Sequence, residues 1–349
     1  MTEEKKVGFF GGKFLPLHQG HIYSILEASN ASDELYVILS SSKNRDRELC
    51  KRDGIKYIPA EVRLSWLGAA LHDLENIKIL HIEDDLWDSN YDWEQGSNQI
   101  KAAIGKPIDL VFSSEPSYGK HFVKYYPNAK HVIVDDKRKT VQISATELRR
   151  NLYNNWDKLP TFVRGYFTKK VALVGTESCG KTTLTKKLAK FFNTNRVLEV
   201  GREYCEKFTN QLTPEMFDHI AMEHYLAQVN ALEDSNKVLF VDSDAVVTQF
   251  YLDMYFPGRK SELVEQVAKL QDYDLVLYLE PDVKWVDDGL RSSGESEIRR
   301  KNNERLKQMY MDRGIKFVSL SGNYTERFNR ARELVSNLFK GKSLEARAQ

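Results

Sequence analysis

The fold of the second half of the chain is decided by the segment Val171-Ala172-Leu173-Val174-Gly175-Thr176-Glu177-Ser178-Cys179-Gly180-Lys181-Thr182-Thr183. It fits the pattern GxxxxGK(S/T) directly after a strand-like apolar run and directly before an amphipathic stretch. In this context the pattern predicts a P-loop, whose backbone amides surround the β-phosphate of ATP. Lys181 would bridge the β- and γ-phosphates, and the Thr182 hydroxyl would bind Mg²⁺. We therefore expect residues 175–183 to bind ATP.

Short apolar runs alternate with longer amphipathic stretches on both sides of this segment, which is typical of α/β folds with parallel sheets. In the first half we expect strands at residues 6–10, 35–40, 77–82, 109–112 and 130–134, and helices at 20–29, 61–73, 92–104 and 145–157. In the second half we expect strands at 170–174, 196–200, 238–242, 275–279 and 316–320, and helices at 181–192, 214–235 and 296–313. The 349 residues exceed what one core usually supports. We predict two doubly wound domains, Rossmann-like at residues 1–168 and P-loop at 169–349, joined by a short connection at 159–168.

The composition excludes several classes of protein. Lys plus Arg (51) nearly equals Asp plus Glu (50), so the chain lacks the basic excess that favours binding to nucleic acids. Cys50, Cys179 and Cys205 form no CxxC pair, which excludes a disulfide framework and indicates the reducing cytoplasm. No apolar run approaches the roughly 20 residues that span a bilayer, so we expect no membrane helix.

A second chemical segment lies near the N-terminus, Phe9-Phe10-Gly11-Gly12-Lys13-Phe14-Leu15-Pro16-Leu17-His18-Gln19-Gly20-His21. It follows the first predicted strand and enters the first helix, where α/β proteins bind ligands. Gly11 and Gly12 allow a backbone to approach phosphates closely. His18 and His21 are three residues apart, so both imidazoles can face one polyphosphate and stabilise charge on its α-phosphate.

The segment Ile143-Ser144-Ala145-Thr146-Glu147-Leu148-Arg149 also suits phosphate. Ser144 and Thr146 offer hydroxyls and amides at a helix start, and Arg149 offers a fork of donors one turn later.

Together these two segments resemble the nucleotidylyltransferase superfamily, whose GxFxPxHxGH frame matches at Gly12, Phe14, Pro16, His18, Gly20 and His21 and whose ISxTxxR motif matches at 143–149. The resemblance implies in-line adenylyl transfer without a covalent enzyme intermediate. It also implies that Lys13 lies near the ATP phosphates, and that Ser114 and Asp135 contact the adenosine side.

The acceptor of the first domain is less directly indicated. Residues 84–93 pack aromatic side chains into a polar loop, which suits stacking on a flat ring and hydrogen bonding to a ribose. In superfamily members that make NAD, a Trp of this region stacks on nicotinamide, and Trp93, beside Asp92, matches that position. The alternative is a solvated loop with an amphipathic anchor.

In the second half, Asp242 ends a predicted buried strand and is placed to hold Mg²⁺ through water. Asp244 either faces the acceptor or caps a helix at residues 245–255. Arg202 and Glu203 form an acceptor-side candidate, although Glu203 could be only a helix-starting acid. A polar loop with Trp285, Asp287 and Arg291, followed by Arg299 and Arg300, is typical of a kinase lid, with one of the last two arginines on a solvated face.

The order of the two halves and the GREY, DxD and WVxDGLRS segments resemble the NadR family of bifunctional nicotinamide mononucleotide (NMN) adenylyltransferases and ribosylnicotinamide kinases. The resemblance implies that the second half phosphorylates nicotinamide riboside to NMN and that the first half joins NMN to AMP from ATP, giving NAD and pyrophosphate. Nicotinamide would stack near Trp93 and Trp285. DNA-binding regulation is not expected, whereas a homo-oligomer and coupling to a riboside transporter are compatible with the resemblance. Two alternatives stay open, a transferase and kinase for another vitamin-derived acceptor and a non-catalytic nucleotide sensor.

Overall fold

The computed structural model describes residues 5–83, 92–135, 137–282 and 296–340. The chain forms two compact units, Met1–Val163 and Arg164–Gln349. The division therefore falls inside a helix, α7 (Thr161–Phe167), slightly before the boundary expected at residue 168. None of the helices in the described ranges is long and apolar enough to cross a membrane.

The first unit contains one parallel sheet in the order β3-β2-β1-β4-β5. Its strands are β1 (Val7–Gly12), β2 (Glu34–Ser41), β3 (Ile77–Glu83), β4 (Leu110–Ser113) and β5 (Lys130–Ile133). The helices are α1 (Gln19–Asn30), α2 (Lys43–Arg52), α3 (Ala60–Leu71), α4 (Trp93–Ile104), α5 (Gly119–Tyr125) and α6 (Ala145–Arg150), with short 3₁₀ turns η1 (Pro116–Tyr118) and η2 (Trp156–Lys158). Val7 and Phe9 of β1 pack with Ile104 of α4 and Phe122 of α5.

The second unit contains a second parallel sheet in the order β10-β9-β6-β8-β7. Its strands are β6 (Lys169–Val174), β7 (Arg196–Val197), β8 (Val238–Asp242), β9 (Leu275–Leu279) and β10 (Val318–Leu320). The helices are α8 (Lys181–Phe192), α9 (Val200–Lys207), α10 (Pro214–Ala231), α11 (Ala245–Tyr255), α12 (Glu262–Leu270), α13 (Ser296–Asp312) and α14 (Tyr324–Leu338).

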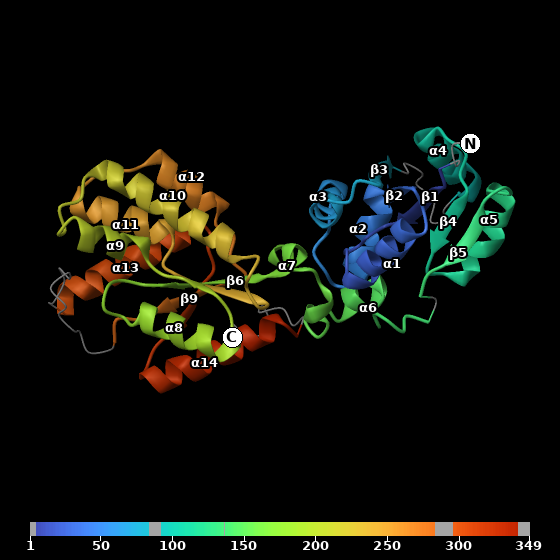
Figure 1. Ribbon diagram of the computed structural model, residues 1–349. Coiled ribbons are helices and arrows are strands. Elements are labelled where there is room, and N and C mark those ends of the chain that lie inside the picture. The colour runs from blue at the N-terminus through green and yellow to red at the C-terminus, as the bar shows by residue number, and fades with distance from the viewer. Residues whose placement is uncertain (1–4, 84–91, 136, 283–295, 341–349) are drawn as a thin grey trace. The chain divides into compact units, whose positions relative to one another are not determined.

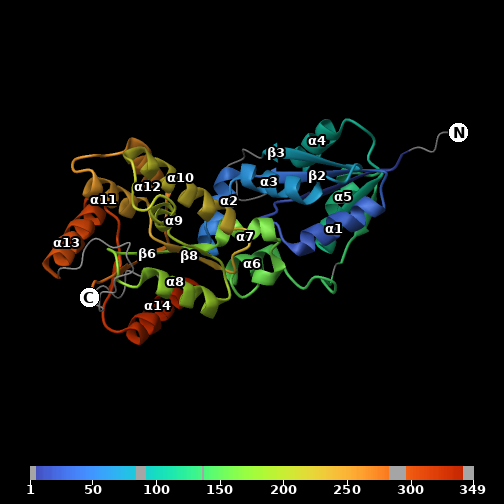
Figure 2. The same ribbon diagram turned by 60° about the vertical axis from the view of Figure 1, so that its left-hand side comes forward.

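Helices cover both faces of the second sheet because alternate residues of a strand point to opposite faces. Val171 and Leu173 of β6 pack against α8 and α14, whereas Ala172 and Val174 pack against α11 and α13. The same two groups of helices are seen on opposite sides of the sheet in Figure 1 and Figure 2. The predicted class, two α/β domains with doubly wound parallel sheets, is confirmed.

Both nucleotide-binding segments follow the central strand of their sheet, β1 in one unit and β6 in the other. A central strand of a doubly wound sheet has neighbours whose connections leave in opposite directions, which opens a crevice at its carboxyl end. The fold therefore places each candidate site at such a crevice.

Three local predictions were wrong. The strand expected at 196–200 ends at Val197, and Val200 already begins α9. The helix expected at 145–157 ends at Arg150. Asn151, Asn154 and Asn155 follow, and Asn side chains compete with the helix for backbone hydrogen bonds. The Asn155 side chain donates to the Asn151 carbonyl at 3.0 Å. The connection expected at 159–168 contains α7.

Candidate active sites

The loop between β1 and α1 holds the two histidines against each other. His18 caps α1, and its Nδ1 accepts a hydrogen bond from the His21 amide at 3.3 Å. The two imidazole rings stack with centroids 3.6 Å apart. A Cβ atom on Gly20 would lie 3.1 Å from the His18 ring, so the glycine of this motif leaves room for the stacked pair.

Burial keeps both histidines neutral in the free protein. It lowers the pKa of His18 from 6.5 to about 3, with help from the positive charge of Arg138. Burial, His18 and Arg138 hold the pKa of His21 well below 6.5. Because Nδ1 of His18 accepts the amide hydrogen bond, the proton of the neutral ring is on Nε2. Nε2 of His18 and Nδ1 of His21 are buried without a hydrogen-bond partner among the described residues, so both can serve a ligand.

Two buried arginines hold the backbone of the same loop. Arg63, on α3, donates to the Lys13 carbonyl and to Asp46, both at 2.8 Å. The Lys13 ammonium also binds Asp46 at 2.8 Å, and the side chains of Arg63 and Asp46 are fully buried. The sequence did not single out Arg63 or Asp46, and it predicted Lys13 only as a phosphate contact. Lys13 thus pairs with a buried carboxylate while its own side chain stays 39% exposed.

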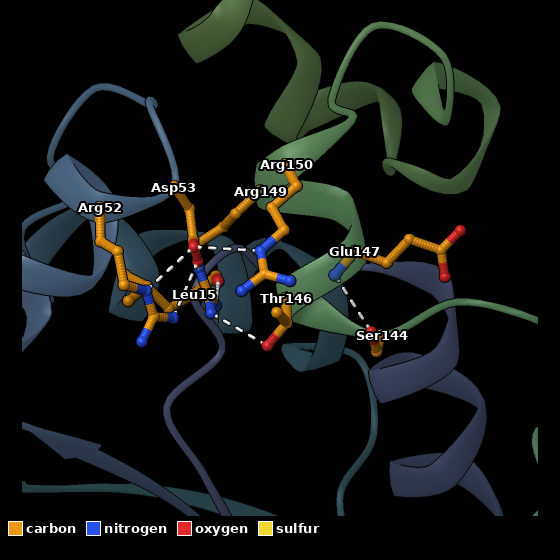
Figure 3. Close-up of polar contacts among 8 residues, drawn as sticks. All are labelled: Leu15, Arg52, Asp53, Ser144, Thr146, Glu147, Arg149 and Arg150. Carbon is orange, nitrogen blue, oxygen red and sulfur yellow. Dashed lines mark hydrogen bonds and ion pairs between the residues drawn. The ribbon is translucent and has the colours of Figure 1, made fainter.

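The second arginine is Arg149, which connects the two predicted phosphate segments (Figure 3). Its Nη1 donates to the Leu15 carbonyl at 2.8 Å, its Nη2 to Thr146 Oγ1 at 3.1 Å and its Nε to Asp53 at 2.7 Å. Ser144 caps α6 through a 3.1 Å hydrogen bond from the Glu147 amide. The structure therefore brings residues 143–149 into contact with the β1–α1 loop, and it assigns most of the Arg149 guanidinium to protein partners.

Asp53, which the sequence also did not single out, accepts from three arginines, since Arg52 and Arg150 join Arg149 around its carboxylate. Desolvation opposes ionisation of Asp53, but the hydrogen bonds from Arg52 and Arg149 outweigh it and lower its pKa to about 2. Asp53 is therefore a carboxylate throughout the physiological pH range and a fixed partner for Arg149.

The remaining predicted residues of the first unit make local contacts. Ser114 lies 3.2 Å from the Ser24 hydroxyl of α1, and Asp135, in the left-handed region at φ 50°, accepts the Lys139 amide at 2.7 Å. Trp93 stacks on His121, with centroids 4.1 Å apart, and Asp92 caps α4. His121 thus covers one face of Trp93, as the amphipathic-anchor alternative expects.

In the second unit a cavity of about 500 Å³ opens beside the P-loop. It is lined by P-loop residues and by side chains of α9, α10 and α11. Gly175 has φ +142°, and a Cβ atom there would lie 2.7 Å from the Leu279 carbonyl oxygen, so only glycine fits this turn. Lys181 is buried, and its Nζ donates to the Thr176 carbonyl at 3.0 Å.

Thr182, which lines this cavity, contacts Asp242 at the end of β8. The Thr182 hydroxyl donates to Asp242 Oδ2 at 2.5 Å, whereas Oδ1 of Asp242 is buried with no partner among the described residues. Burial and the negative charge of Glu199 raise the pKa of Asp242 to about 6, against the influence of Lys181. Glu199, just before α9, also lines the cavity. It escaped the sequence analysis because only the fold brings it to the P-loop.

Comparisons with known proteins match the domain that contains each of the two loops. A family model described as "Cytidylyltransferase-like" matches residues 9–151, and one described as "AAA domain" matches residues 170–327. The chain is 35% identical over 346 residues to the Trifunctional NAD biosynthesis/regulator protein NadR of Escherichia coli (strain K12), covering 96% of this chain and 84% of that protein. The chain belongs to the NadR family. The protein of the same description from Salmonella typhimurium is also 35% identical, over 347 residues, with the same coverage.

Solved structures of the NadR family share the whole architecture. A crystal structure of NadR protein in complex with NR matches with a TM-score of 0.78 and 26% identity, covering 98% of each chain. A crystal structure of NadR protein in complex with NAD and AMP-PNP matches equally well. The chain is thus a NadR-family enzyme that combines a nucleotidyltransferase and a P-loop kinase and binds ATP.

Three further residues of the kinase half can be placed relative to the cavity. Asp244 lines it but also caps α11, where it accepts from the Val247 amide at 3.0 Å and from the Tyr310 hydroxyl at 2.8 Å. The helix-cap alternative is therefore realised. Arg202 lines the cavity, whereas Glu203 is exposed on the same helix.

The two candidate lid arginines of the NadR-family chain differ in position. Arg299 lies beside Thr176 and Glu177 of the P-loop, and its Nε and Nη2 are buried with no hydrogen-bond partner among the described residues. Arg300 is exposed and pairs with Glu304 one turn along α13 at 2.8 Å. Of the two arginines, Arg299 is the one that lies beside the P-loop. Trp285, Asp287 and Arg291 lie outside the described residues.

Proposed function

We propose that this NadR-family enzyme makes NAD from nicotinamide riboside in two steps, each using one ATP. The second unit transfers the γ-phosphoryl group of ATP to the riboside, giving NMN and ADP. The first unit then transfers AMP from ATP to NMN, giving NAD and pyrophosphate. The proposal depends on two groups of polar side chains that follow the central strands of the two sheets. One group is His18 with His21, and the other is Lys181 with Thr182 and Asp242. Both stand in a chain that matches NadR-family proteins over nearly its whole length.

The kinase site fits a magnesium ion. Mg²⁺ prefers oxygen ligands and normally keeps waters and phosphate oxygens in its coordination shell. The Thr182 hydroxyl and Asp242, with its unpartnered buried Oδ1, supply the protein's share of such a shell. When bound, Mg²⁺ would offset the negative charge of the β- and γ-phosphates.

The chain's own groups then position the phosphoryl group. Lys181 brings a buried positive charge to the phosphates, and P-loop amides surround them. Arg299, with two unpartnered nitrogens beside the P-loop, would stabilise charge that develops on the γ-phosphate. The bond between the γ-phosphorus and the oxygen that it shares with the β-phosphate breaks as the riboside hydroxyl oxygen attacks, so that ADP leaves and the hydroxyl proton passes to solvent water. Asp244 lines the acceptor side but is committed to Val247 and Tyr310, so we assign it a positioning role.

In the first unit the histidines stabilise the α-phosphate. A phosphate oxygen of NMN attacks the α-phosphorus in line, and pyrophosphate leaves from the opposite side. The Nε2–H group of His18 donates to an α-phosphate oxygen, and His21, stacked on it, faces the same charge. Because Arg63 and Arg149 fix the carbonyls of Lys13 and Leu15, these donors are held in place before ATP binds.

The cysteines support a reducing location. All three are free thiols, with Cys50 and Cys179 buried and Cys205 partly exposed, as is usual for proteins of the cytoplasm. We therefore place both reactions there. A homo-oligomer and coupling to a riboside transporter remain expectations from the family resemblance.

Two separate assays with the full chain, ATP and Mg²⁺ test the proposal, one following riboside to NMN and the other NMN to NAD. Lys181→Ala should abolish only the first reaction and His18→Ala only the second. Lys190→Ala, on the exposed side of α8, and His72→Ala, exposed in the first unit, serve as matched controls and should retain both activities. Turnover of neither compound by the wild type would reject the proposal in favour of another acceptor or a sensor.

A further inference from the structure

One buried histidine in the wall of the kinase cavity is not used by the chemistry described above. His224, on α10, lines the cavity and is only 4% exposed. Its Nε2 is buried with no hydrogen-bond partner among the described residues. A buried polar nitrogen without a partner is costly unless a ligand or water satisfies it. The position of His224 therefore suggests a contact that forms when the acceptor binds.

A chain of hydrogen bonds behind His224 fixes which nitrogen carries the proton. The Tyr273 hydroxyl donates to Gln228 Oε1 at 3.1 Å, so the amide nitrogen of Gln228 faces the histidine. Nε2 of Gln228 lies 3.2 Å from Nδ1 of His224. An amide nitrogen is only a donor, so Nδ1 must accept and the ring proton must be on Nε2. His224 thus carries an N–H donor that its own helix does not use.

The surroundings keep this donor neutral. Because Nδ1 accepts the hydrogen bond from Gln228, the ring holds one proton and carries no charge. A neutral N–H donor suits an uncharged oxygen, such as a hydroxyl or a carboxamide carbonyl. Glu199 lines the same cavity, and its negative charge favours a cationic acceptor ring. A nucleoside of a carboxamide-bearing pyridinium combines these features.

We propose that His224 is a specificity-determining residue of the kinase site, whose Nε2–H donates a hydrogen bond to an oxygen of the acceptor nucleoside. This inference rests on the proposed function. Gln228 and Tyr273 are positioning residues, because they act only by fixing the tautomer and orientation of the imidazole. The oxygen is either the carboxamide carbonyl or a ribose hydroxyl, since both accept hydrogen bonds.

The test is the steady-state kinetics of riboside phosphorylation by His224→Phe, which keeps a flat ring but removes the donor. Losing one neutral hydrogen bond should lower kcat/KM for the riboside by about three- to tenfold, mainly through KM, with KM for ATP unchanged. His219→Phe, at an exposed position of the same helix, is the matched control and should behave as wild type. Tyr273→Phe keeps His224 and removes only the orienting hydroxyl, so it should shift KM in the same direction by less.

An acceptor that lacks the carboxamide, pyridinium riboside, distinguishes the two oxygens. If the His224→Phe penalty vanishes with this compound, the donor binds the carboxamide; if it persists, the donor binds the ribose. Two results would overturn the role of His224 while leaving the proposed function intact. One is a kcat/KM for nicotinamide riboside that is equal in the wild type and His224→Phe, and the other is an equal decrease of kcat/KM for ATP and for the riboside. Absence of wild-type turnover would instead overturn the proposed function.

Discussion

Replacing Asp53 by Asn should loosen the loop that carries the transferase histidines. The Arg149 side chain is only 6% exposed, and its strongest partner is the Asp53 carboxylate at 2.7 Å. Removing one member of a buried ion pair costs about 3–5 kcal/mol, whereas the exposed pairs of Asp53 with Arg52 and Arg150 contribute at most about 1 kcal/mol each. Arg149 keeps its hydrogen bonds to Leu15 and Thr146, so we expect the free energy of unfolding to fall by an amount near the lower limit, about 3 kcal/mol.

For a unit of this size, that loss corresponds to a decrease in Tm of about 6–12 °C. The measurement is thermal inactivation of the full-length enzyme, with each activity reporting on its own unit. Transferase activity should be lost at a lower temperature in Asp53→Asn, and kinase activity at the wild-type temperature. Asp73→Asn, an exposed aspartate of the same unit, is the control. If both variants lose transferase activity at the wild-type temperature, the Asp53–Arg149 pair does not stabilise the loop.

Two further predictions concern charge. Arg299→Ala should lower the kcat of the kinase by about tenfold or more, because two unpartnered nitrogens of Arg299 lie beside the P-loop. Arg300→Ala should change kcat less than twofold, as is usual for an exposed ion pair. Equal effects of the two variants on kcat would contradict the role given to Arg299. The pKa of His18 is about 3 in the folded protein, against an ordinary value of 6.5. Between these two pH values the unfolded chain therefore binds more protons than the folded chain. The free energy of unfolding should consequently fall as the pH drops below 6.5, by up to about 1.4 kcal/mol per pH unit. The Tm of the ligand-free first unit should follow this trend, and His18→Asn should weaken it; an unchanged pH dependence in that variant would disprove the linkage.

The sheets and phosphate loops could be predicted because their signals are local. All five residues of β8 are buried, so its sequence is a continuous apolar run ending in Asp242. The P-loop and the HxGH segment each lie within a dozen or so residues directly after such a run. Local pattern and tertiary structure agree at these places, as expected for a foldable sequence.

The supporting residues could not be predicted, because their signals are not local. Of the ten residues of α2 only Asp46 and Cys50 are buried, so the helix shows no apolar stripe and its charges are typical of a solvated face. Yet α2 and the residue after it supply Asp46 and Asp53, whose arginine partners lie 17 and 96 residues away. His224 likewise lies on a helix remote in sequence from the P-loop. For Asp244 the sequence allowed two roles, and only the folded structure shows the capping hydrogen bond.

The division of the chain into two units has a consequence for metabolism. Within the described residues, those assigned to adenylyl transfer lie before position 150, and those assigned to the kinase lie after position 174. Each polypeptide thus carries one copy of each catalyst, and synthesis of more protein raises both capacities together. A cell cannot alter their ratio by gene expression from this chain. The ratio of the two fluxes is set instead by side chains such as His18 and Lys181 and by the concentrations of the metabolites that reach each unit.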